Sequence, residues 1–356
     1  VEIWWLDSRE MVVLEEATPT ATPVLFYTPT PSQFEGNNLN AAGSRASAAA
    51  DTGTFIFRYV SDAAGLRAAI IEANDDPDNT YVLYLASSRY TVFDEHESYS
   101  ANRVTGRVII VGRESYNLGI HPADLPEEKR VIIERDDSAP EVDIFRNDGH
   151  LTLYNVVVRN GGGYGRWGGG GFVNWDNLSI YNSLIIDNKA LYSRGGVGAG
   201  IFNNPTGLVH LVNTIFQNNQ GTQANTGHGG GAFSNEGGTI AGNCVTFDSN
   251  IASYGGAIEN INISQIPTGT INLQNVNFIN NRAAYQYGAV YQNSGTGPIT
   301  IVPTASYWNP AFSTIPYFLN SSNVVVPTPH ASALIPLNCA VPPAPQPSRS
   351  PADVPP

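Results

Sequence analysis

Four asparagines in the second half of the chain follow one another at a constant interval of 31 residues. They are Asn188, Asn219, Asn250 and Asn281, and the apolar residues three positions before them are Ile185, Phe216, Phe247 and Phe278. A second signature combines small residues, an apolar residue and an Asn. It reads GGGFVN at 169–174, GAGIFN at 198–203, GGAFSN at 230–235, GGAIEN at 255–260 and GAVYQN at 288–293. A double motif that recurs in this way predicts a repeat architecture.

Within one unit the apolar residues alternate with polar ones. Ile271 and Leu273 alternate, and so do Val276 and Phe278, between Gly and Asn residues. This pattern predicts short strands and turns rather than helices. One such unit cannot bury its apolar face alone, so successive units must stack. At about 4.8 Å per coil, each Asn would lie above its counterpart and the amides could form a hydrogen-bonded ladder. The phenylalanines would stack just inside that corner. We therefore predict an all-β chain folded as a single-stranded parallel β-helix.

The paired repeat GGA[ILV] and FxxN resembles that of chlamydial polymorphic outer-membrane proteins and related bacterial surface passengers. The resemblance covers roughly residues 150–300. It implies a right-handed, three-faced β-helix that is exported to the bacterial cell surface for adhesive or structural work. This chain ends in Pro-rich sequence rather than in long alternating strands, so anchoring by a membrane barrel of its own is not expected.

Composition divides the chain into four segments. A strand–helix–strand pattern around the predicted helix at 66–73 is similar to the openings of many secreted β-helix proteins. Such a helix would cover the open end of the stack and prevent edge-to-edge pairing. The predicted segments are an extended N-terminal arm with a Thr/Pro-rich linker at 1–53, a cap at 54–93, a parallel β-helix at 94–326 and a Pro-rich tail at 327–356. The Pro-rich parts are predicted to be extended spacers.

The N-terminal arm carries apolar residues ahead of its linker: Ile3, Trp4, Trp5, Leu6, Met11, Val12, Val13 and Leu14. This piece could fold back on its own β-helix, remain disordered, or pair with a neighbouring subunit as an added strand. The last alternative would give a head-to-tail contact, which builds filaments when it does not close into a ring. We therefore expect the most relevant partner to be a second copy of the chain.

Charge and cysteine content restrict the other partners. The net charge is −13 and Lys129 and Lys189 are the only lysines, which argues against nucleic acid and anionic lipid as partners. The sequence contains no run of about 18 apolar residues, so we do not expect direct insertion into a membrane. We expect a secreted, extracellular protein. In that compartment Cys244 and Cys339 can form a disulfide, the alternative being two buried thiols. A disulfide would tie the tail back along the stack.

An aromatic strip is the main candidate contact site. Tyr192, Tyr254 and Tyr285 each follow a ladder Asn by four residues, and Tyr164 follows Asn160 in the same way. With Trp167 they could bind a glycan, a host surface or a neighbouring cell, since rings stack on sugars and anchor interfaces. The alternative is a tyrosine stack that only covers the corner loops. A carbohydrate-binding β-helix is therefore a second functional hypothesis.

Catalysis is the third hypothesis, as a polysaccharide lyase or hydrolase. Such enzymes need clustered carboxylates on one face. Glu236 and Glu259 on successive coils form the best candidate pair, whereas we predict that Asp187 aligns with Gln217 and therefore does not stack with Asp248. His210 and His228 lack metal-ligand spacing, and no cofactor is expected. The sequence therefore favours a non-enzymatic structural or adhesive surface protein.

Overall fold

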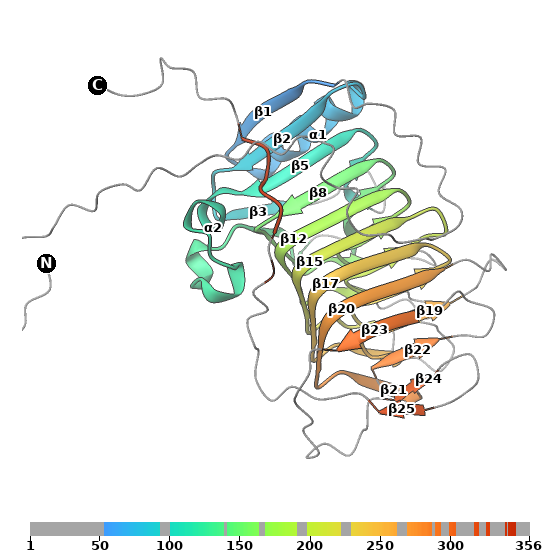
Figure 1. Ribbon diagram of the computed structural model, residues 1–356. Helices are drawn as coiled ribbons and strands as arrows, with labels where there is room; N and C mark the ends of the chain where they lie inside the picture. Colours follow the sequence, from blue (N-terminus) through green and yellow to red (C-terminus); the bar gives the residue numbers. More distant parts are fainter. Residues whose placement is uncertain are drawn as a thin grey trace, which may run out of the picture. The chain divides into compact units, whose positions relative to one another are not determined.

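The computed structural model in Figure 1 consists mainly of strands that stack in the order of the sequence. It describes residues 53–92, 100–138, 141–163, 168–190, 198–221, 229–261, 269–286, 289–292, 299–303, 317–319, 325–327, 339 and 341–346. The N-terminal arm, with all its apolar residues from Ile3 to Leu14, lies outside the described residues.

The longest sheet, called the long sheet below, is parallel throughout. Its main run, in spatial order, is β1 (Phe55–Val60), β2 (Thr80–Leu85), β5 (Arg107–Gly112), β8 (His150–Tyr154), β12 (Asn177–Ile186), β15 (Leu208–Gln217), β17 (Thr239–Asp248), β20 (Thr270–Ile279) and β23 (Ile299–Pro303). A side run pairs β3 (Arg89–Val92) with β6 (Ile132–Arg135), β6 with β9 (Val157–Arg159), and β9 with the second half of β12.

A second sheet collects the strands that follow in each unit. Its order is β4 (Ser100–Val104), β7 (Asp143–Asn147), β11 (Phe172–Asn174), β14 (Ile201–Asn203), β16 (Phe233–Glu236), β19 (Ile258–Ile261), β22 (Val290–Gln292), β24 (Tyr317–Leu319) and β25 (Val325–Pro327). Only the last pair listed, β24 with β25, is antiparallel. Two short pairs join β10 (Gly162–Gly163) to β13 (Lys189–Ala190), and β18 (Ile251–Tyr254) to β21 (Arg282–Gln286).

The chain thus returns to each sheet once per unit, always beside the strand it made before. The prediction of a mainly β chain with long parallel sheets is confirmed, and this arrangement is compatible with a parallel β-helix.

Two corners per unit use backbone with positive φ. One corner bends the long strands between their halves, at Asn155, Asn182, Asn213, Cys244 and Asn275. The other ends them, at Asn160, Asp187, Asn218, Ser249 and Asn280. Asn is the side chain that most readily tolerates this conformation after Gly, so its abundance here follows from the corners. The first corner was not anticipated from the sequence.

The inward side chains of both sheets form one apolar core. In the repeat region they include Phe216 and Phe247, whose ring centroids are 5.4 Å apart, and Phe278, 5.1 Å beyond Phe247. Phe233 of the second sheet meets Phe247 edge-on at 5.3 Å. The predicted phenylalanine column therefore exists, and Phe233 of the glycine-rich motif packs against its side.

Helix α1 (Ala63–Asp75) lies at the β1 end, longer than the predicted 66–73. Its N-cap Asp62 accepts a hydrogen bond from the Gly65 N–H at 2.7 Å, and it buries Leu66, Ala69, Ile70 and Ala73. Asn74 near its end accepts the Thr105 and Gly106 N–H groups. The helix is thus fastened to the first coil. The remaining helical pieces are α2 (Arg113–Leu118), η2 (Pro122–Asp124) and η3 (Glu127–Lys129). Among the described residues, none of the helices has the length and hydropathy of a membrane span.

Candidate functional site

The asparagines of the constant interval form a buried ladder. Asn188 Nδ2 donates to Asn219 Oδ1 at 3.0 Å, Asn219 to Asn250 at 3.0 Å, and Asn250 to Asn281 at 2.9 Å. Each Nδ2 also donates to a backbone carbonyl one coil back, such as Ile185 for Asn219. Each of the last three Oδ1 atoms accepts a backbone N–H of the coil before. The amides of Asn188, Asn219 and Asn250 are therefore fully used, which is what burial requires.

A second ladder, which was not predicted, runs through the Asn that ends the glycine-rich motif. Asn147 Nδ2 donates to Asn174 Oδ1 at 2.7 Å, and the series continues through Asn203, Asn235 and Asn260 at 2.8 to 2.9 Å. Its amides donate toward later coils, as those of the first ladder do. The two buried ladders hold two corners of every unit in the repeat region, so the scaffold is fixed by side chains as well as by backbone pairing.

The predicted aromatic strip is only partly within the described residues. Tyr164, Trp167 and Tyr192 lie outside them, and His228 does as well. Tyr254 is half-buried on β18, where its backbone pairs with Gln286 across a register shift rather than with Tyr285. The two tyrosines are thus one position out of line along the stack. The strip stays a prediction.

The strand register shows which residues lie beside each candidate carboxylate on the neighbouring coil. Ile186, not Asp187, pairs with Gln217, and Asp187 holds the positive-φ corner position that Asn218 holds one coil on, as the 31-residue interval requires. Asp248 pairs with Gln217, so Asp187 and Asp248 do not stack, as expected. Glu236 and Glu259 are buried on neighbouring strands, but Glu259 pairs with Ser234 and accepts a hydrogen bond from the Ser234 hydroxyl at 3.2 Å. The two carboxylates are therefore not directly opposite each other.

The outward face of the long sheet carries an aligned row of large side chains. The residues in register are Tyr59, Tyr84, Val111, Tyr154, Tyr181 and Val212, and we call them the outer column. The rings of Tyr154 and Tyr181 stack at 4.8 Å, and those of Tyr59 and Tyr84 at 5.6 Å. Tyr181 Oη lies 3.1 Å from His210 Nδ1, and burial raises the pKa of Tyr181.

A disulfide joins Cys244, at the end of this face, to Cys339, with Cα atoms 6.2 Å apart. This distance is normal for a disulfide. Cys339 and residues 341–346, which we call the strap, lie against the outer column: Ala344 is buried among its side chains, and Val341 packs beside them. In Figure 1 this red segment crosses the long strands from β12 toward β2.

A histidine contact holds the η2 segment to a corner of β15. His121 Nδ1 accepts the Ala123 N–H at 3.0 Å, and Nε2 lies 3.1 Å from the Asn213 carbonyl oxygen. These partners require the neutral ring with its proton on Nε2. Burial lowers the pKa of His121, which favours the same form.

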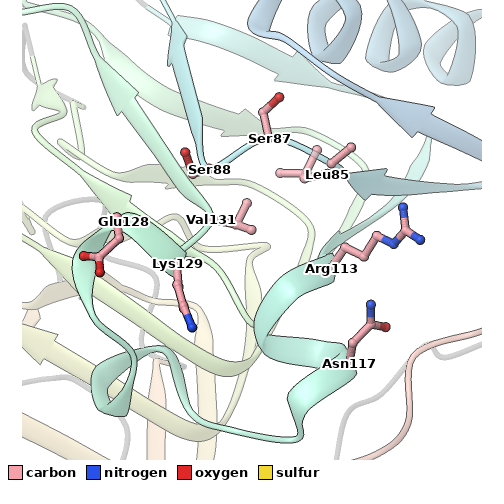
Figure 2. Close-up of a pocket in the computed structure, with 9 residues that line it drawn as sticks. Leu85, Ser87, Ser88, Arg113, Asn117, Glu128, Lys129 and Val131 are labelled. Carbon is pink, nitrogen blue, oxygen red and sulfur yellow. The ribbon is translucent and has the colours of Figure 1, made fainter.

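A surface pocket lies beside α2 (Figure 2). Its volume is about 350 Å³, and its lining residues are Leu85, Ala86, Ser87, Ser88, Arg113, Asn117, Glu128, Lys129 and Val131. Arg113 and Lys129 are exposed, and the Arg113 guanidinium lies 5.7 Å from the Tyr59 ring. Exposed charges are screened by water and salt, so these two attract a charged ligand only weakly.

Among the described residues, no three His, Cys, Asp or Glu side chains are grouped to hold a metal ion. Comparison of the chain with protein-family models, curated proteins and solved structures gave no match.

Proposed function

We propose that this chain is a secreted structural protein of the cell surface, built as a right-handed parallel β-helix that associates end to end. The handedness rests on a general rule, since connections between parallel strands of one sheet are right-handed in about 98% of cases. The disulfide supports export, because such bonds persist in oxidising compartments. The resemblance of the paired motifs to bacterial surface proteins supports the same location.

The free edge of the long sheet at β1 is the observation that supports end-to-end association. Within the described residues β1 is the terminal strand and pairs with β2 on one side only. Phe55 is 48% exposed and Tyr59 is 65% exposed. Proteins usually protect such an edge with charges, Pro or a bulge. The charge on β1 is Arg58, and it is paired with Glu72 on α1. Helix α1 covers the apolar core at this end through Leu66, Ala69, Ile70 and Ala73, but within the described residues it does not pair with the free edge of β1, so that edge is suited to receive another strand.

The donor in this proposal is the apolar N-terminal arm, residues 3–14, of a neighbouring copy. Addition of a strand to an exposed edge uses backbone hydrogen bonds for affinity and alternate side chains for specificity. A contact between an arm and the edge of the next copy is heterologous, so it extends into a filament when the rotation does not close.

Electron microscopy and light scattering of the purified protein test the proposal. We expect filaments or oligomers from the full chain, and monomers when residues 1–16 are removed. The double variant Phe55→Lys/Tyr59→Lys should also be monomeric, because charges on an edge strand oppose pairing. Leu208→Lys is the matched control, since Leu208 is 49% exposed but lies on β15 in the middle of the sheet. Monomers from the unmodified chain at all concentrations would refute end-to-end association.

A further inference from the structure

The outer column presents a continuous surface of aromatic and branched side chains. Its members come from consecutive strands, and Val82 and Ile109 flank them on the same face. Tyr154 and Tyr181 stack with an interplanar angle of 21°, so their rings form one wall. Tyr84 of the same column adds a hydroxyl group that donates a hydrogen bond. Such a surface offers apolar contact and hydrogen-bond donors side by side.

The strap lies along this surface and makes specific contacts at both ends. Cys339 is bonded to Cys244 on β17. Toward the other end the Tyr84 hydroxyl donates a hydrogen bond to the Pro345 carbonyl oxygen. Between them Ala344 is only 3% exposed. The strap sequence from 339 to 346 is CAVPPAPQ, with Pro342, Pro343 and Pro345.

The span requires an extended strap. From β17 to β2 the sheet has five steps between strands, or about 24 Å at 4.8 Å each. Six residues from Cys339 to Pro345 cover about 19 Å in the polyproline II conformation, at 3.1 Å per residue. The side chains of Cys244 and Tyr84 bridge the remainder. A helix would cover about 9 Å at 1.5 Å per residue and could not reach.

We propose that the outer column is a binding site for proline-rich chain in the polyproline II conformation, and that the strap is its resident ligand. Proline has no N–H, so it can be buried against tyrosines without leaving a donor unsatisfied. Its carbonyl oxygens accept hydrogen bonds from hydroxyl groups. Proline-rich segments dock in this way on aromatic grooves, because their conformation is already fixed.

The disulfide sets how strongly the strap occupies the site. With the bond in place, five residues separate the anchor at Cys339 from the contact at Pro345. Without it, the strap is attached only through the chain that precedes it, which lowers its effective concentration. A proline-rich segment from outside can then compete. The site is therefore open to external ligands only when the two cysteines are not bonded.

Methyl NMR of the full chain with labelled alanine tests this proposal. Ala344 packs among tyrosine rings, so its methyl signal should be shifted by ring currents in the unmodified protein. The probe is the unlabelled peptide VPPAPQP, which copies residues 341–347. In the double variant Cys244→Ser/Cys339→Ser, the peptide should move this signal to its unpacked position at about millimolar concentration, comparable to the effective concentration of a flexible tether. The disulfide-bonded protein should show no displacement at that concentration.

Two further variants in the same cysteine-free background act as a pair. Tyr84→Phe removes the hydroxyl that bonds Pro345, so the affinity of the strap for the column should fall about fivefold, and the Ala344 methyl signal should move toward its unpacked position before any peptide is added. Tyr81→Phe removes a hydroxyl from the opposite face of the same strand, where it bonds Asp76, and should leave the Ala344 signal unchanged.

Three results would overturn the proposal: an unshifted Ala344 methyl in the disulfide-bonded protein, no displacement by VPPAPQP, or equal displacement by the glycine analogue VGGAGQG. Filament formation is a separate measurement, so failure here leaves the assembly proposal intact.

Discussion

The buried ladder and the bend of the long strands both contain a column of asparagines, but for different reasons. In the ladder, Asn219 has no exposure, and its amide makes bonds to two neighbouring asparagines and to two backbone groups. At the bend, Asn213 is half-buried and its φ is 49°. Its side chain donates one bond, to Asn182 Oδ1 at 2.7 Å. The first position needs the amide, and the second needs mainly the left-handed backbone.

Cys244 shows that a unit can lose its Asn at the bend. It stands at the bend, where Asn182, Asn213 and Asn275 stand in other units, and has a φ of 57°. The column is interrupted there, and the next bond shifts to Asn275 Nδ2 and Asn243 Oδ1. A disulfide could replace an amide at the bend because little depended on that amide. No unit could make the same exchange in the buried ladder.

Loss of the disulfide should have the largest effect on stability. The bond joins residues 95 apart, and the chain-entropy model gives about 4–5 kcal/mol for such a loop. We expect Cys244→Ser/Cys339→Ser to lower the free energy of unfolding by this amount, measured by guanidinium chloride denaturation. Cys244→Asn/Cys339→Ser should be equally destabilised, even though it restores an Asn to the bend. Recovery of full stability by that variant would mean that the bend depends on its amides.

Asn219→Leu should be the next most damaging. It leaves the Asn188 N–H and the Ile185 carbonyl without their partners in the core. At about 1–3 kcal/mol for each unsatisfied group, we expect a loss of about 3 kcal/mol. Denaturation at a single pH measures it. A loss below about 1 kcal/mol would show that water replaces the amide. The ladder would then align the coils without adding much to their stability.

Acid should weaken the contact between η2 and the bend. The pKa of His121 is lowered in the folded protein, so the unfolded chain takes up the proton first. The contribution of His121 is therefore complete above the unfolded pKa of about 6.5 and is lost as the pH falls through it. Free energies of unfolding at pH 7.5 and 5.5 should differ less in His121→Gln than in the unmodified chain. His150→Gln, at an exposed position of β8, is the control.

Asn213→Gly should have the smallest effect. Glycine accepts positive φ without strain, which offsets the loss of one half-exposed hydrogen bond. We expect a change within about 1 kcal/mol by the same denaturation measurement. A loss similar to that of Asn219→Leu would remove the distinction between the two columns.

The sequence predicted the features that repeat at a constant interval. The ladder from Asn188 to Asn281 was visible because insertions of different length on the two sides of each unit compensate and keep its members 31 residues apart. The second ladder was not, because its members are 27, 29, 32 and 25 residues apart. Insertions of different length precede its corners, so no fixed interval aligns them. The one-residue error at Asp187 has a different origin, because the same 31-residue interval already places Ile186 opposite Gln217 and Asp187 opposite Asn218.

The strap could not be predicted beyond the possible cysteine pair. Tyr84 and Pro345 are 261 residues apart, and polyproline chain has no apolar period that indicates which surface it covers. The outer column was equally hidden. Its tyrosines alternate with inward residues on separate strands, and only the register of the sheet brings them into line.

The hydrogen bonding of the buried ladder allows the number of coils to change. Each internal unit contributes one amide that donates to the next unit and accepts from the one before. Insertion of a whole unit between Asn219 and Asn250 would therefore add one donor and one acceptor, and would leave both ends as they are. Gly161 would still donate its N–H to Asn188 Oδ1 at the first rung. The number of coils is thus free to change by duplication, provided that each added unit brings its own Asn back into register at this corner.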